Sequence, residues 1–186
     1  TIIQHFFPDE RDLGAMLTLR TKTTSPVSFM RRDAGLFAGN SINRVTDSRK
    51  DFIGRLGAEK AIGDWGKWGA GFSYYHGFVY NPTTEAYEMR GNHFVKRDMG
   101  ETGTYMKRQY LGLDGQFSFL SSLGKTTLRA EGLIGTQPGI AGSSKSPNYS
   151  TRPENLPENS LFKRPFLGYF FYLVQDIGAS PFSAVL

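Results

Sequence analysis

Cysteine is absent from this 186-residue chain, and so is any run of about 18 apolar residues. The first absence excludes a disulfide framework and a cysteine-ligated metal site. The second excludes a membrane-spanning helix. Basic residues exceed acidic ones by 22 to 17, but they are spread along the chain and form no block. Nucleic-acid-binding proteins usually concentrate basic residues on one face, so no nucleic-acid partner is expected.

Motifs for catalysis or for a bound cofactor are also missing. His5, His76 and His93 lie far apart in the sequence, without the spacing of a metal site. The segment 139–146 (GIAGSSKS) does not match a phosphate loop. Its lysine does not directly follow the second glycine, and no helical pattern comes after it. The sequence therefore predicts neither an enzyme nor a metal or cofactor site.

What the chain does contain is a regular series of strand-like stretches. They lie at 11–20, 28–38, 51–62, 67–79, 107–119, 125–136, 164–176 and from 182 onward. The joins are alternately short (21–27, 63–66, 120–124, 177–181) and long (39–50, 80–106, 137–163). Antiparallel strands that all cross one membrane have short turns on one side and long loops on the other. The series therefore predicts an all-β fold, namely a transmembrane antiparallel up-and-down β-barrel in the bacterial outer membrane.

Both ends of the sequence indicate part of a larger barrel. The chain opens at Thr1 without the charged start, apolar core and cleavage site of a signal peptide. Leu186 falls inside the last expected strand, and a strand cut short leaves an edge that hydrocarbon does not tolerate. Residues 1–186 are expected to form one contiguous segment of a single β-barrel domain, with about eight strands and no second domain.

Side-chain alternation assigns two faces to these strands. The clearest case has Leu111, Leu113, Phe117 and Phe119 in one row and Arg108, Tyr110, Asp114, Gln116 and Ser118 in the other. Because a strand has a period of two, the rows lie on opposite faces. We expect the apolar row to meet lipid and the polar row to line a water-filled lumen. Arg32 departs from the pattern, since it falls in the apolar row of 28–38. The stretch 164–176 is apolar in both rows, and its phase stays open.

The polar row supplies the candidate channel-lining residues. They are Arg31, Asp33, Arg55, Glu59, Arg108, Asp114, Gln116, Arg129 and Glu131. Acids and bases interleave here, so mutual neutralisation between strands and ion selection both stay open. A second set consists of aromatic residues typical of a membrane–water interface. They are Trp65, Trp68, Phe72, Tyr74, Phe117 and Phe119.

Five phrases along the chain carry a family resemblance. They are 10–14 (ERDLG), 33–40 (DAGLFAGN), 47–54 (DSRKDFIG), 135–139 (GTQPG) and 173–178 (LVQDIG). These phrases resemble Bacteroidota porins of the phosphate-selective porin O/P family. The resemblance implies a general or anion-preferring diffusion barrel of about sixteen strands, assembled as a homotrimer, of which this chain is a middle section. Studied members carry a ladder of arginines in the pore, and the interleaved acids of this chain depart from it.

The predicted function is that of an outer-membrane porin, a channel for passive diffusion of ions and small hydrophilic or anionic solutes. Its expected partners are outer-membrane lipid, those solutes, and further copies or subunits in an outer-membrane complex. Three alternatives stay open. The first is an outer-membrane barrel whose long loops act as an adhesin or as a subunit of a secretion or uptake assembly. The others are a barrel hydrolase and a soluble β-sandwich or lipocalin-like binder.

Overall fold

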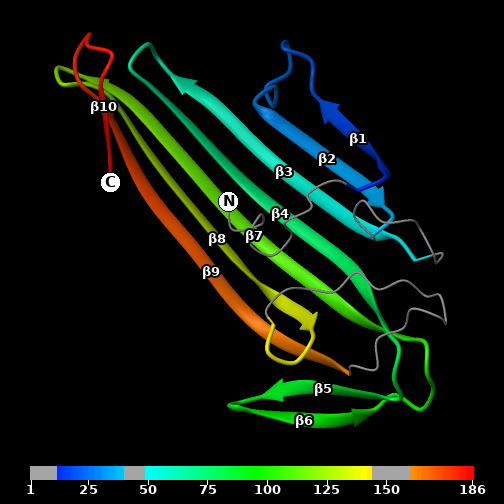
Figure 1. Cartoon of the computed structure of the whole chain (residues 1–186). Coiled ribbons are helices and arrows are strands. Elements are labelled where there is room, and N and C mark those ends of the chain that lie inside the picture. Colours follow the sequence, from blue (N-terminus) through cyan, green and yellow to red (C-terminus); the bar gives the residue numbers. More distant parts are fainter. Residues whose placement is uncertain (1–11, 40–48, 144–159) are drawn as a thin grey trace.

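The chain folds as one open β-sheet (Figure 1). The computed structural model describes residues 12–39, 49–143 and 160–186. Its strands are β1 (Gly14–Arg20), β2 (Met30–Phe37), β3 (Asp51–Ile62), β4 (Gly66–Asn81), β5 (Glu85–Arg90), β6 (His93–Asp98), β7 (Thr104–Ser121), β8 (Gly124–Gly139), β9 (Leu161–Asp176) and β10 (Ser183–Val185). No helix within these ranges is long and apolar enough to cross a membrane. The prediction of an all-β fold is confirmed, as a sheet that is mainly antiparallel and does not close.

The spatial order of the strands is β1-β2-β3-β4-β7-β8-β9-β5-β6, with β10 also paired to β9. Apart from β5 and β6, strands that follow one another along the chain are therefore antiparallel neighbours. Three of their short turns have a glycine with positive φ within or beside them: Gly63 (53°), Gly124 (115°) and Gly178 (56°). Glycine adopts this conformation without steric cost. Local turn chemistry thus sets up the meander that the sequence predicts.

Several strands are longer than their sequence patterns indicate. β3 covers the predicted 51–62, but β7 begins at Thr104 rather than at 107, and β8 continues to Gly139 rather than ending at 136. The additional residues do not alternate in polarity, yet their backbones pair with a long neighbour. The β4–β7 ladder, for example, continues to Asn81 opposite Thr104. Pairing between strands, which local pattern does not contain, therefore sets these ends.

The long join predicted at 80–106 contains regular structure that the sequence analysis missed. β5 and β6 form an antiparallel hairpin within it. Gly91, with φ of 59°, lies in the tight turn between them. A two-residue Gly-Asn turn between short alternating runs was the available signal. The first strand of this hairpin pairs in parallel with the beginning of β9, through Ala86 opposite Leu161. The hairpin therefore lies beside a strand far away in the sequence (Figure 1).

A small buried cluster lies where this hairpin meets the sheet. Its members are Val79, Ala86, Met106 and Leu161, with Met99 packed against them. Ala86 and Leu161 are 0% exposed. Elsewhere in the described sheet, large apolar side chains are mostly open to the surroundings. The packing that holds the hairpin is thus unlike that of the rest of the sheet.

Strand register gives the main sheet two chemically different faces. On the first, Leu56 lies opposite Phe72, which lies opposite Leu113. We name this the apolar face, and its side chains are exposed, Leu113 by 66%. On the second, which we name the polar face, Asp33 lies opposite Arg55. The phases predicted from alternation agree with this register. For β9, whose phase the sequence left open, the partners place Tyr169 on the apolar face and Phe170 on the polar one.

Candidate functional site

The centre of the polar face holds an ion pair between two strands that are not neighbours. The Nη1 and Nη2 atoms of Arg55, on β3, donate to the two carboxylate oxygens of Asp114, on β7, at 2.6 and 2.9 Å. Nη1 also donates to the Ser73 hydroxyl at 2.8 Å. The pair passes over β4 at Gly71, where a side-chain Cβ would collide with both ions. Bidentate geometry makes this pair more directional than a single contact.

Two further ion pairs follow along the same face. Asp33 accepts hydrogen bonds from the Thr18 hydroxyl at 2.6 Å and from Arg31 Nε at 3.0 Å. Closer to the short turns, Lys67 Nζ lies 2.6 Å from Glu59 Oε1. Asp33 and Glu59 are therefore each matched with a cation from the same strand or a neighbouring strand. Mutual neutralisation, one of the two interpretations left open by the interleaved charges, is found at these positions.

These ion pairs line a hollow of about 680 Å³. Its charged walls come from Arg20, Arg31, Asp33, Arg55, Glu59, Lys67, Asp114 and Arg129. Arg20 and Arg129 have no carboxylate partner among the described residues, although Arg129 donates to the Tyr172 hydroxyl at 3.1 Å. The hollow consequently carries more positive than negative charge. Gln116 belongs to the same lining, and Glu131, opposite Asp114 on β8, faces the same side.

Arg108 also lies on the polar face, but it is buried. Its side chain is 3% exposed and pairs with Asp51, whose side chain is 4% exposed. The Tyr75 hydroxyl donates to the same carboxylate, and so does the backbone N–H of Phe78, at 3.2 Å. No pattern in the sequence singles out Asp51 or Tyr75. Tyr75 lies on β4, next to the strand of Arg108, and Asp51 lies on β3, on the far side of β4. Strand register, which joins distant parts of the chain, is what brings the three side chains together.

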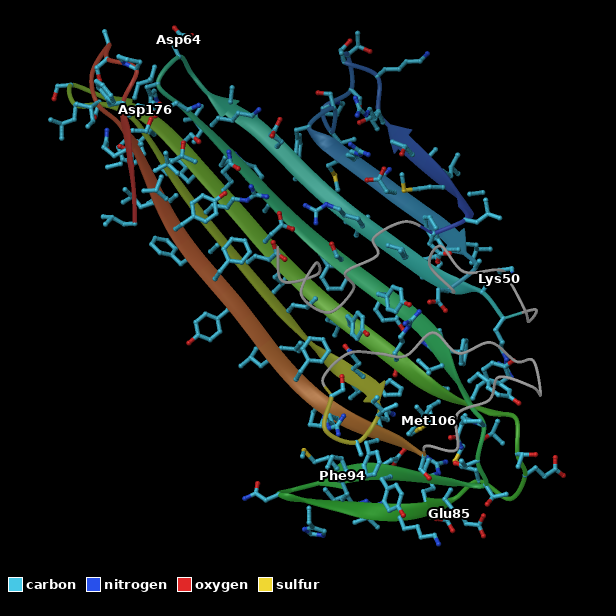
Figure 2. All side chains as sticks on the ribbon, in the orientation of Figure 1. Lys50, Asp64, Glu85, Phe94, Met106 and Asp176 are labelled. Atoms are coloured by element: carbon cyan, nitrogen blue, oxygen red, sulfur yellow. The ribbon has the colours of Figure 1, made fainter. Side chains whose placement is uncertain are left out.

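The predicted interface aromatics gather on the apolar face and at its border near the short turns. The Trp65 ring meets Phe117 edge-on at 6.3 Å, and Phe117 lies 5.6 Å from Phe119. Trp68 contacts Phe29, which precedes β2, at 6.5 Å. Phe72 and Tyr74 continue the row of Trp68 along β4. Figure 2 shows the side chains of both faces, with Asp64 marking the turn beside Trp65.

Among the described residues, no group of three or more acidic or histidine side chains comes together as a metal site would require. His76 lies on the apolar face, stacked against Tyr74 at 6.4 Å between ring centroids. His93 begins β6 and is exposed. His5 falls outside the described residues. The two described histidines thus lie on different strands and in different surroundings.

Comparison with known proteins gives no match to a family model, to a curated protein or to a solved structure. The resemblance to phosphate-selective porins therefore stays a prediction from the quoted phrases. Fold geometry and side-chain chemistry carry the functional argument.

Proposed function

We propose that this chain forms part of the wall of an outer-membrane porin, a water-filled channel for ions and small hydrophilic solutes. One observation carries the proposal. Within a single sheet, one face exposes large apolar side chains over many strands, while the reverse face carries charged side chains around a hollow. Exposed apolar surface of this extent is costly in water. In a membrane the same surface is favourable, and the charged face then borders water.

The extent of the apolar face along the strands supports a location within a membrane. On β7 it is bordered by Gln109 towards the long loops, and it extends to Phe119 at the short turn. These ten residue steps span about 34 Å along the strand. A tilt of about 40° reduces that length to about 26 Å along the membrane normal, close to the apolar band of about 25 Å in outer-membrane barrels.

The two edges of the sheet would need partner strands in a membrane. Among the described strands, β1 pairs only with β2, so its other edge carries unpaired backbone groups. Such an edge is not tolerated in hydrocarbon. A porin containing this sheet must therefore pair β1, and the free part of β9, with further strands. Those strands belong to a longer chain or to a second copy.

The hairpin favours a second candidate function, in which the long loops bind a partner as an adhesin or as a subunit of a secretion or uptake assembly. The hairpin carries two ion pairs, one on each of its faces: Lys96–Glu85 at 2.5 Å and Arg97–Glu88 at 2.8 Å. The hydrogen bond to Glu85 raises the pKa of Lys96. An ordered, charged hairpin at the loop end presents a fixed surface to another protein.

Electrical recording from planar bilayers distinguishes the two functions. We expect the full-length protein to produce stepwise single-channel currents, whereas a plugged or scaffold barrel produces none. The variant Asp114→Asn gives a more specific test of the hollow. It leaves Arg55 without its carboxylate and makes the hollow more positive. Its reversal potential in a salt gradient should move towards the anion equilibrium potential. Glu85→Gln, on the hairpin, is the matched loss of one carboxylate and should leave the reversal potential in place. Absence of current from the wild type would reject the channel.

A further inference from the structure

The two faces of the described sheet differ in where their carboxylates lie, because the polar face carries charges of both signs and the apolar face carries positive charges only. In β2, β3, β7 and β8 every carboxylate lies on the polar face: Asp33, Asp51, Glu59, Asp114 and Glu131. On the apolar face of the same strands, the charged residues are all cations, namely Arg32, Lys60 and Lys107. A membrane supplies no soluble counter-ion to its apolar core, so cations there need an anion from the lipid itself.

Arg32 is the cation of this set that lies among apolar neighbours. It is opposite Leu19 on β1 and Leu56 on β3. It is exposed, and no hydrogen bond or ion pair joins it to another described residue. Arg31, the preceding residue, points to the other face and pairs with Asp33. An unpaired guanidinium on an apolar face is costly unless an anion from outside the chain meets it.

A groove of about 270 Å³ adjoins Arg32 on the apolar face. It exists because the row Leu17, Ala34, Gly54 and Tyr74 has two small residues between two large ones. Leu56 and Phe72 contribute apolar side walls. The volume exceeds the roughly 150 Å³ that accommodates a benzene ring in an apolar cavity. The groove therefore has the size and chemistry to hold a length of hydrocarbon chain.

The position of Arg32 along its strand fits the headgroup region. β2 begins at Met30, so Arg32 is two residues, about 7 Å, from the end that follows a short turn. A long guanidinium side chain at this depth reaches the interface while its stem stays against apolar surface. Guanidinium groups bind phosphate through paired hydrogen bonds.

We infer that the apolar face holds a specific phospholipid, with its phosphate on Arg32 and an acyl chain in the groove beside Ala34 and Gly54. This inference rests on the proposed membrane location. The occupant is a glycerophospholipid of the leaflet that faces the short turns. Charge complementarity selects it, because the described strands of the main sheet offer cations and apolar surface on this face and no carboxylate to a lipid.

Native mass spectrometry of the full-length protein, with phosphatidylglycerol added in detergent, tests the site. Arg32→Gln should lower the retained lipid about tenfold, as expected for loss of a charge-assisted hydrogen bond worth about 1.5 kcal/mol. Ala34→Leu fills the groove, leaves Arg32 in place, and should also lower retention. Arg31→Gln changes the neighbouring arginine on the opposite face and should retain the lipid. Inorganic phosphate should not displace it, because it lacks the acyl chain.

The outcomes separate this inference from the channel proposal. Equal lipid retention by wild type and Arg32→Gln overturns the site even if the protein conducts ions. Loss of the lipid in Arg32→Gln and in Ala34→Leu, with single-channel currents preserved, supports the lipid site. A protein that retains the lipid through Arg32 but passes no current overturns the channel alone. If the variants instead split an oligomer without changing retention, a second copy occupies this face and the inference is wrong.

Discussion

At Gly71 the backbone of β4 passes directly beneath the Arg55–Asp114 ion pair, which leaves no room for a side chain. Its register partner Gly57, on the same face of β3, has open space where a Cβ would be. We expect Gly71→Ala to lower the free energy of unfolding by about 1–2 kcal/mol, because the guanidinium must move away from the carboxylate. Gly57→Ala should be neutral or stabilising by up to about 1 kcal/mol, since it restricts the unfolded chain. Denaturant unfolding in detergent micelles measures both, and equal losses would contradict the close approach at Gly71.

A second prediction at the residue scale tests which face meets lipid. Leu113 is 66% exposed on the apolar face, and Gln116, on the same strand, lines the hollow on the other. Leu113→Arg should cost about 2–4 kcal/mol of stability in a lipid bilayer, because a cation replaces apolar surface within the membrane. Gln116→Arg places the same side chain towards water and should cost less than about 1 kcal/mol. The comparison uses equilibrium unfolding in lipid vesicles, and similar costs would show that the assignment of faces to lipid and water is wrong.

At the scale of elements, the β5–β6 hairpin depends on a few buried contacts with β9. Leu161 is 0% exposed there, while Leu167, on the same strand, is 69% exposed on the apolar face. Leu161→Ala should destabilise the hairpin contact by about 2–5 kcal/mol, because it leaves a cavity. The hairpin turn at Gly91 should then become sensitive to proteolysis. Leu167→Ala removes the same atoms without a cavity and should keep the wild-type cleavage rate. Resistance of both variants would mean that the hairpin is held elsewhere.

The aromatic contacts around the hairpin add to that dependence. Phe162, at the start of β9, stacks on Tyr87 at 4.6 Å and meets Phe94 edge-on at 5.1 Å. Arg164 lies over both phenylalanine rings and donates to the backbone oxygens of Ile140 and Ser143. Stacked and edge-on rings contribute beyond the area that they bury. Both strands of the hairpin, the start of β9 and the residues that follow β8 are therefore joined in one local assembly.

At the scale of the whole molecule, the tryptophans report how the sheet sits in a bilayer. The chain contains two, Trp65 and Trp68, both near the β3–β4 turn. Membrane-interface aromatics lie at headgroup level. We therefore expect their fluorescence to be quenched more by lipids with bromine near the carbonyl groups than by lipids with bromine near the chain ends. Stronger quenching by the deep probe would contradict the proposed height of the belt, and absence of quenching would contradict membrane insertion.

Much of the site is readable in the alternation of single strands. The pattern around Leu113 assigns two faces to β7 before any partner is known, and the same holds for Arg55 on β3. Arg108 shows where this reasoning ends. Alternation places it correctly on the polar face, but only its neighbours Asp51 and Tyr75 determine that it is buried. Burial depends on how strands from different parts of the chain are aligned, and that alignment is not a property of one strand.

By itself the sequence determined the all-β character, the approximate positions of most strands and, where polarity alternates, the side of the strand that is apolar, because turn chemistry and period-two alternation act over a few residues. Only the tertiary structure decided the bridge over Gly71, the placement of the hairpin beside β9 and the groove next to Arg32. Each of these arises where residues far apart in the chain are brought together by register. Long-range pairing selects one register for the whole sheet, and local pattern does not specify it.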